Sequence, residues 1–441
     1  MKSFLDQFFK LKENKTSVRV ELLGGMTTFM TMSYIIFVQP ALLSSTGMDR
    51  GAVMVATCIS SALATLLMGL LARYPIALAP GMGLNVFFAI TVCGVMGYSW
   101  QIALGAVFIS GTVFILLSIL KVWDKLVNAV PNSLKHAIAV GIGLFITLIG
   151  LEYGGIVVDT PGSYIGIGDL TSRPVILVLV GVIVIAVLLS MKVRSAMLLG
   201  ILFTALLGIL MGVVKFQGIL APPPSIAPTL FKLDILGALQ TGMITVVFVF
   251  FFIDLFDTMG TLIGVSGSAG LLKEGKLPRA NKAMMADAVG TVSGALLGTS
   301  TVTSYIESST GIAHGARTGL ANIATSFLFL VALFFSPLTE MIGGEVQHGG
   351  LSLKPVVAPA LIIVGFFMIK CVKMIDWEDI TEAIPAFLTI AIIPLTMSIT
   401  EGIAFGFISL AILKLVTGKS KEVHWLIYLF AVLFIVRYIV S

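Results

Sequence analysis

Long stretches without a single charged side chain dominate this sequence of 441 residues. A helix needs about 20 mostly apolar residues to cross the roughly 30 Å hydrocarbon core of a bilayer. The composition agrees, because only 11% of the residues are charged, against about 25% in a soluble domain. We therefore predict an all-α polytopic membrane protein with about 14 membrane segments, several of them short. Stretches free of Asp, Glu, Lys and Arg cover residues 22–48, 51–72, 74–120, 174–191, 196–214, 235–253, 288–306 and 318–339.

The basic residues predict how the chain is oriented. They gather in alternate loops, with examples at Lys121, Lys125, Lys192, Arg194, Lys273, Lys276, Arg279 and Lys282. The positive-inside rule places these loops and the N-terminus in the cytoplasm, for a protein of the inner (cell) membrane. Residues 1–20 are rich in charge and are interpreted as a cytoplasmic leader. The loops account for the net charge of +5, so we expect a lipid bilayer and no nucleic acid as partner.

Two apolar segments, one in each half of the chain, are interrupted by helix-breaking residues. The first reads Ala-Pro-Gly-Met-Gly-Leu-Asn and ends at Asn85; the second reads Gly-Thr-Ser-Thr-Val-Thr-Ser-Tyr-Ile-Glu and ends at Glu307. Matching interrupted segments in two halves indicate the binding site of a transporter. Seven segments in each half, an odd number, would make the two repeats inverted in topology.

Asp254 and Asp257 directly follow an apolar run and lie three residues apart, so a helix would place them on one face. A carboxylate at membrane depth costs at least ~2.5–3.5 kcal/mol, so a polar cavity must offset this cost. We interpret the pair as carboxyls that hold or release a proton. The alternative is that Asp257 lies at the membrane interface and caps the next segment. Asp287 has two possible roles as well, as a helix N-terminal acid or as a coupling residue.

Glu307 and Asn85 are candidates for binding a ligand. A carboxylate can accept paired N–H donors from a planar base, and an amide offers both a donor and an acceptor. The alternatives are a loop acid at the rim for Glu307 and a helix–helix hydrogen bond for Asn85. Phe87 and Phe252 could stack on an aromatic ligand, although plain packing is the commoner role for any one of the 29 Phe residues. The sequence contains no zinc motif, phosphate-binding loop or nucleophile elbow, so we expect no cofactor and no enzyme.

These residues lie in motifs that resemble the AzgA-like purine permeases, a branch of the nucleobase/cation symporters. The resemblance covers nearly the whole chain. Its most specific stretches are Gly-Met-Thr-Thr-Phe at residues 25–29, Ala-Pro-Gly-Met-Gly-Leu-Asn at 79–85, Phe-Asp-Thr-Met-Gly-Thr-Leu at 256–262, Gly-Thr-Ser at 298–300, Tyr-Ile-Glu-Ser-Ser at 305–309 and Arg-Thr-Gly-Leu at 317–320.

The resemblance implies a fold of two inverted seven-segment repeats, with short extended pieces in segments 3 and 10 around Gly83 and Thr303. Segments 1–4 and 8–11 would form a core domain that holds the substrate, and segments 5–7 and 12–14 a gate domain. The core would move against the gate like an elevator, in a homodimer. The boundaries that follow are 1–20 for the leader, 21–121 and 234–342 for the core, 122–216 and 355–417 for the gate, and 424–441 for a C-terminal hydrophobic segment, which either spans the membrane or lies at its interface.

The family pattern also assigns roles to individual residues. Glu307 looks like the main base-binding acid, with Asn85, Gly83 and Thr303 beside it. Asp254 looks like a second binding or coupling acid, and Asp257 like an organiser of the site that also carries the proton.

The first segment departs from the family in one position. Where many members have Val-Asn-Pro, this chain has Gln39 between Val38 and Pro40, a position expected to lie outside the site.

The resemblance implies proton symport of purine nucleobases. The stretches 218–224 and 398–404 are similar to adenine permeases in particular, and guanine or hypoxanthine stays open because its permeases share the core motifs. Two other functions are considered. The first is an anion transporter of similar fold, which would need a cation at the midplane. The second is an intramembrane enzyme that uses Asp254 and Asp257.

Overall fold

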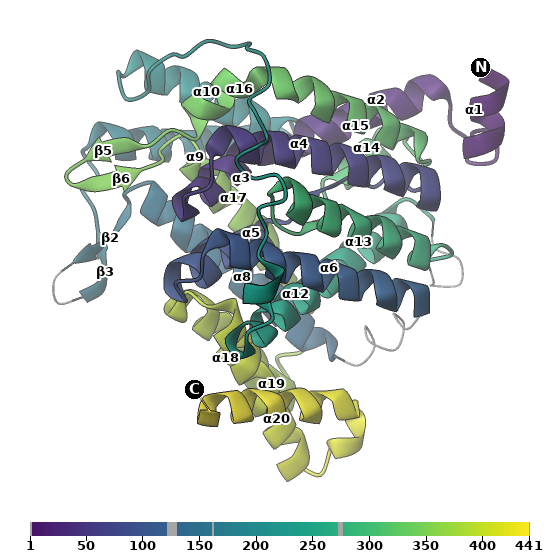
Figure 1. Cartoon of the computed structure of the whole chain (residues 1–441), viewed down its shortest axis with the longest axis vertical. Coiled ribbons are helices and arrows are strands. Elements are labelled where there is room, and N and C mark those ends of the chain that lie inside the picture. The colour runs from purple at the N-terminus through teal and green to yellow at the C-terminus, as the bar shows by residue number, and fades with distance from the viewer. Residues whose placement is uncertain (1, 121–129, 161–162, 272–276, 441) are drawn as a thin grey trace.

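The computed structural model describes residues 2–120, 130–160, 163–271 and 277–440. The predicted domain boundary between residues 121 and 122 lies outside the described residues, as do the loop residues Lys121, Lys125, Lys273 and Lys276. The helices form one bundle in which most axes run in a similar direction (Figure 1). Helix α1 (Lys2–Phe9) lies at one end of this bundle, here called the α1 end, and two β-hairpins lie at the other, here called the hairpin end.

The first seven segments follow the predicted order. They are α2–α3 (Val18–Met32 and Ile35–Leu43), α4 (Arg50–Leu67) with its π-helical continuation η2 (Met68–Ala72), β1–α5–η3 (Leu78–Pro80, Met82–Val86 and Phe87–Val95), α6 (Trp100–Leu120), α8 (Asn132–Tyr153), α9 (Arg173–Ser190) and α10 (Ala196–Leu210). The hairpin of β2 (Val157–Thr160) and β3 (Ser163–Ile167) joins α8 to α9.

The second seven segments repeat this order. After the short α11 (Ile235–Ala238) come α12 (Thr241–Ser268), α13 (Ala280–Leu297), β4–α14 (Val302–Ser304 and Ser308–Ala313), α15–α16 (Leu320–Ala332 and Ser336–Ile342), α17 (Ala358–Ile369), α18 (Ile380–Thr396) and α19 (Ile399–Val416). The hairpin of β5 (Val346–His348) and β6 (Leu351–Leu353) precedes α17, and α20 (Trp425–Val440) ends the chain.

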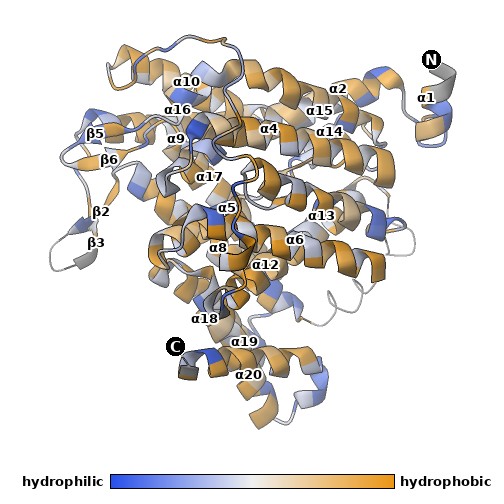
Figure 2. Cartoon of the chain, in the orientation of Figure 1, coloured by the Kyte–Doolittle hydropathy of each residue, from blue (hydrophilic) through white to orange (hydrophobic). Residues whose placement is uncertain are grey.

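By length and composition, eight of the described helices can cross a membrane, and four more are apolar but shorter. Apolar residues cover most of the bundle, with polar ones mainly at its ends and loops (Figure 2). The prediction of an all-α polytopic fold with short extended pieces is therefore confirmed.

The two broken segments meet in the middle of the molecule. Strands β1 and β4 pair antiparallel, with Ala79 opposite Thr303. In each strand, a threonine hydroxyl from a neighbouring helix forms hydrogen bonds with the backbone amide and carbonyl of one residue. Thr65 Oγ1 accepts from the Leu78 amide at 2.9 Å and donates to the Leu78 carbonyl at 3.0 Å. Thr291 Oγ1 does the same for Val302, at 3.2 and 2.9 Å. Non-helical backbone can thus lie inside a membrane protein without unpaired polar groups.

The helices pack in two groups. In one group, here called the core, α13 packs against α4 and α6, and α15 packs against α2 and α4. In the other, here called the gate, α8 packs against α17 and α18, and α18 packs against α19. Strands β1 and β4 and the acidic helix α12 lie within the core, which therefore holds the site described below.

Helix α20 packs on α19. Arg437 Nη2 donates to Glu401 Oε1 at 2.7 Å, and Tyr438 also donates to Glu401. Glu401 lies in the first turn of α19, so α20 runs antiparallel to α19 and reaches the level at which α19 begins. The C-terminal hydrophobic segment is therefore a helix that packs on the gate through α19.

Candidate functional site

Three aspartates gather beside β4. Helix α12 contributes Asp254 and Asp257, and α13 contributes Asp287, two turns into the helix. Thr258 Oγ1 lies 2.7 Å from Asp287 Oδ1 and 3.1 Å from Thr303 Oγ1. Thr303 Oγ1 lies 3.2 Å from Asp257 Oδ2. Two hydroxyls therefore join Asp287 to Asp257 in a continuous polar chain.

The polar chain from Asp287 to Asp257 has one hydrogen fewer than its hydrogen bonds require. It contains three close oxygen–oxygen contacts, but each threonine hydroxyl supplies only one hydrogen. If Thr258 donates to Asp287 and Thr303 donates to Asp257, the contact between the two hydroxyls has no hydrogen. A proton on either carboxyl allows that carboxyl to donate to its threonine, which completes all three contacts. The geometry is therefore suited to one proton shared between Asp257 and Asp287.

Among the residues that the structure describes, the three aspartates have no basic partner. Asp254 and Asp287 are fully buried, and Asp254 Oδ1 and Asp287 Oδ2 have no hydrogen-bond partner. The other oxygen of Asp254 has only a long contact, 3.5 Å from Thr291 Oγ1. None of the ion pairs among the described residues includes these carboxyls. Because an unpaired buried charge is very costly, neutralisation has to come from a proton or another bound cation.

Asp257 borders open space instead. It is exposed, and so are Gly260 and Gly264 further along the same face of α12. A Cβ atom added at either glycine would meet nothing within 4 Å. A carboxyl does not face lipid at low cost, and Asp257 is the only exposed one of the three aspartates. Since α12 continues from Asp257 toward its last residue, Ser268, just before the basic loop, this exposed face runs toward the α1 end.

Asn85 lies in α5, and its amide is held from both sides. Ser300 donates to Asn85 Oδ1, and Asn85 Nδ2 donates to the Pro80 carbonyl at 3.3 Å. Gln39 Nε2 in turn donates to Ser300 Oγ and Thr299 Oγ1, both at 3.0 Å. Gln39 was expected outside the site, but it is fully buried and belongs to the network that orients Asn85.

Glu307 follows β4 directly and precedes α14. Its side chain is half-buried, and its Oε1 accepts a hydrogen bond from the Tyr34 hydroxyl at 2.8 Å. The neighbouring Tyr305 donates to the Pro80 carbonyl at 2.6 Å. Segments 1, 3 and 10 thus converge on one small polar region. Tyr34 was not a sequence candidate, because no Pro or Gly marks the break between α2 and α3 at this position.

The predicted aromatic residues are packed by protein. Phe87 is buried with its ring centroid 4.8 Å from that of Phe250. Phe252 lies among Phe248, Phe256 and Phe407, with centroids 5.6, 4.5 and 5.4 Å away. Both rings therefore pack within aromatic clusters and do not line an open binding site.

Gly83 marks a close approach between the core and the gate. A Cβ atom at this position would lie 2.7 Å from Ile142 Cγ2 of α8. The missing side chain lets α5 pack against the gate, immediately beside Asn85.

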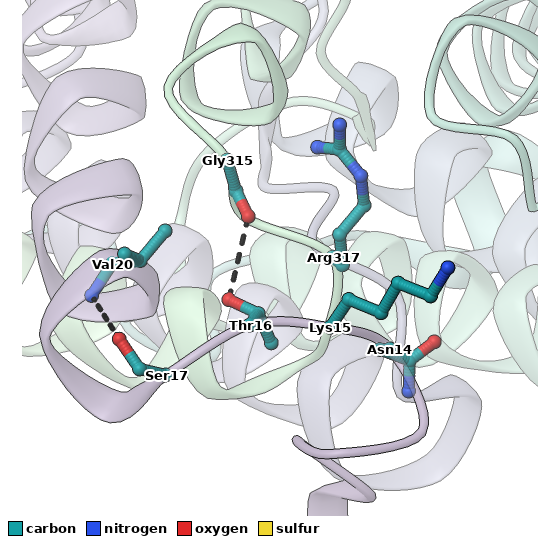
Figure 3. Close-up of a pocket in the computed structure, with 7 residues that line it drawn as sticks. All are labelled: Asn14, Lys15, Thr16, Ser17, Val20, Gly315 and Arg317. Atoms are coloured by element: carbon teal, nitrogen blue, oxygen red, sulfur yellow. Dashed lines mark hydrogen bonds between the residues drawn. The ribbon is translucent and has the colours of Figure 1, made fainter.

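A separate surface pocket lies at the α1 end. It has a volume of about 600 Å³ and is lined by Asn14, Lys15, Thr16, Ser17, Val20, Gly315 and Arg317 (Figure 3). Thr16 Oγ1 donates to the Gly315 carbonyl at 3.4 Å. Arg317 Nη1 donates to the carbonyls of Ile312 and Ala316. None of the predicted site residues lines this pocket, which follows the seam between the leader and the core.

These features define a membrane carrier in which two broken segments cross beside buried acids. Residues 19–405 match the family described as "Permease family", and the chain belongs to this family. The chain is 46% identical to guanine/hypoxanthine permease PbuG of Bacillus subtilis, over 98% of this chain and 99% of PbuG. It is 42% identical to adenine permease AdeP of Escherichia coli K12, over 98% of this chain and 95% of AdeP. The protein is therefore a transporter, and the interpretation as an intramembrane enzyme is wrong.

A solved structure shares the fold. The transmembrane domain of the cyanobacterial bicarbonate transporter BicA superposes with a TM-score of 0.61 and covers 88% of this chain and 97% of that domain. The sequence identity is only 16%, so this likeness concerns the fold alone.

Proposed function

We propose that this protein imports purine nucleobases by proton symport. The two relatives named above are an adenine permease and a guanine/hypoxanthine permease. The observation that carries the proton coupling is the group of Asp254, Asp257 and Asp287, which has no basic partner in the described part of the chain and whose hydroxyl chain is one hydrogen short. A proton that completes this chain also removes charge from the core before it moves.

Base recognition is assigned to Glu307 and Asn85. Glu307 supplies a carboxylate acceptor to the N–H groups of the base, and Asn85 supplies an amide fixed by its neighbours. A base with the wrong pattern of donors would leave buried polar groups unpaired, which discriminates strongly. The sequence stretches 218–224 and 398–404 favour adenine, while guanine and hypoxanthine are the substrates named for a relative of similar identity.

We assign transport to an elevator movement of the core against the gate, in a homodimer in the cell membrane with the N-terminus in the cytoplasm. Three contacts between core and gate support this division, because each would have to change as the core slides. Gly83 packs on Ile142, Thr91 Oγ1 donates to the Met397 carbonyl at 2.9 Å, and Lys354 Nζ donates to the Ala41 carbonyl at 2.6 Å. We assign the exposed face beside Asp257 to an inward-facing state.

The test is uptake of radiolabelled adenine, guanine and hypoxanthine into cells that lack purine uptake, with and without a protonophore. We expect one or more bases to accumulate and the accumulation to collapse with the proton gradient. Asp254→Asn should abolish accumulation, whereas the matched control Asp159→Asn, at an exposed position in β2, should not. No purine uptake in cells that carry the protein in the membrane would overturn the proposal, and uptake of labelled bicarbonate or sulfate would then test the anion alternative.

A further inference from the structure

We propose that Tyr34 is a positioning residue for base recognition: it holds one oxygen of Glu307 and leaves the other for the substrate. This inference rests on the proposed function, because it assigns a task within the same site. It adds a residue from segment 1 to a site that the sequence assigned to segments 3, 8, 9 and 10.

The position of Tyr34 follows from a break in the first segment. Helix α2 ends at Met32 and α3 begins at Ile35, so Tyr34 lies at the junction. Its ring is turned inward and is only 2% exposed. The ring centroid lies 6.5 Å from that of Tyr305, whose hydroxyl is fixed on the Pro80 carbonyl. Tyr34 is therefore a rigid donor, because the packing around its ring leaves little freedom to rotate.

The hydrogen bond from Tyr34 makes the two oxygens of Glu307 different. Oε1 accepts from the tyrosine hydroxyl at 2.8 Å. Oε2 has no hydrogen-bond partner among the described residues, and it is not one of the unpaired atoms enclosed by protein. Because a phenol donates to both a charged and a neutral carboxyl, a proton on Glu307 would have to lie on Oε2. In either state, Oε2 is the atom that meets the substrate.

The backbone of Glu307 is held independently of Tyr34. Thr310 Oγ1 donates to the Glu307 carbonyl at 2.7 Å and lies 3.0 Å from Thr31 Oγ1 of α2. Removing the tyrosine hydroxyl should therefore free the carboxyl group without releasing the backbone of segment 10. The expected effect is on substrate affinity and not on the fold.

The experiment measures KM and the maximal uptake rate per transporter in Tyr34→Phe. A hydrogen bond to a charged group contributes enough that its loss corresponds to roughly tenfold or more in affinity. We expect KM for the transported base to rise about tenfold, with the rate per transporter little changed. The matched control is Tyr428→Phe, which removes a tyrosine hydrogen bond of 3.2 Å to the Ser420 carbonyl near the start of α20 and should leave KM unchanged.

A second variant separates positioning from general damage. Replacing Tyr34 by 3-fluorotyrosine keeps the ring and a phenol that is still protonated at neutral pH, so KM should return close to the wild-type value. If Tyr34→Phe does not transport, equilibrium binding of labelled base to the purified protein replaces uptake, and weakened binding is then expected. Unchanged KM or unchanged binding in Tyr34→Phe would overturn the inference. Absence of purine uptake by the wild-type protein would instead overturn the proposed function.

Discussion

Gly25 sets the distance between α2 and α15, and replacing it by alanine should separate them. A Cβ atom built on Gly25 overlaps the carbonyl oxygen of Ala321, and it would also lie 2.9 Å from the carbonyl carbon of that residue and 3.0 Å from Ala324 Cβ. Ordinary van der Waals contact begins near 3.4 Å. The obstacle is mainly backbone, so no change of rotamer can make room, and one helix has to move.

The cost can be worked from this overlap. A displacement of about 0.5–1 Å loses a quarter to a half of each contact of ~0.1–0.2 kcal/mol, and an interface of this kind contains on the order of 20–30 such contacts. The hydrogen bond from Thr325 Oγ1 to the Gly25 carbonyl, 2.9 Å long, is weakened as well. Alanine in a helix regains about 0.5–1 kcal/mol relative to glycine. The net destabilisation is therefore about 1–2 kcal/mol, within the usual range for overpacking.

The assay is the apparent melting temperature of the protein purified in detergent, compared with Gly264→Ala as matched control. Both glycines lie inside helices, but a Cβ at Gly264 meets nothing within 4 Å. Gly25→Ala should melt several degrees lower than the wild-type protein, at roughly 2–4 °C per kcal/mol, while Gly264→Ala should melt at the same temperature or higher. Equal melting temperatures for the two variants would refute the packing argument.

Three further perturbations test other parts of the molecule. Hydrogen bonds from the Thr381 hydroxyl and amide lower the pKa of Asp379. The ionised carboxyl therefore stabilises the folded state, and this contribution is lost as the pH falls below the ordinary pKa of an aspartate. Melting curves should therefore show that the wild-type protein loses stability as pH falls below about 4 and that Asp379→Asn loses less. Lys414→Met removes a buried ammonium whose carboxylate partners are partly exposed. The free energy of unfolding should therefore change by less than about 1 kcal/mol, which the melting temperature reports. Phe434→Ala should loosen α20, because Phe434 packs on Phe248 and Phe407, and hydrogen exchange in residues 425–440 should become faster.

Most of the fold could be predicted from the sequence because the bilayer imposes a simple requirement. A stretch that crosses it must be long and free of charge, and the breaks were visible as Pro-Gly in segment 3 and as a Ser/Thr run in segment 10. The pairing of Ala79 with Thr303 was not predictable by physical reasoning from the chain. It depends on two halves that fold together across half the sequence, and strands of three residues have no periodicity to detect.

The site was only partly predictable for a related reason. Asp254, Asp257 and Asp287 are noticeable because acids are rare in apolar stretches, and the structure brings all three to β4. Tyr34, Gln39 and Ser300 gave no such signal, because neutral polar residues occur throughout membrane helices as ordinary hydrogen-bond partners. Only the folded chain distinguishes a hydroxyl that orients Asn85 or Glu307 from one that bonds its own helix.

The two repeats are alike in how they satisfy the backbone but different in their chemistry. Thr65 and Thr291 support their strands in the same way, which is what an inverted repeat should conserve if the crossing is the scaffold. The carboxyls around the crossing come from the second repeat, whereas the first supplies neutral donors such as Tyr34 and Gln39. A symmetric set of acids would place more like charges in one low-dielectric region, at a cost that neutral partners avoid. In the function proposed above, this asymmetry would let the second repeat take up a proton while the first orients the groups that receive the substrate.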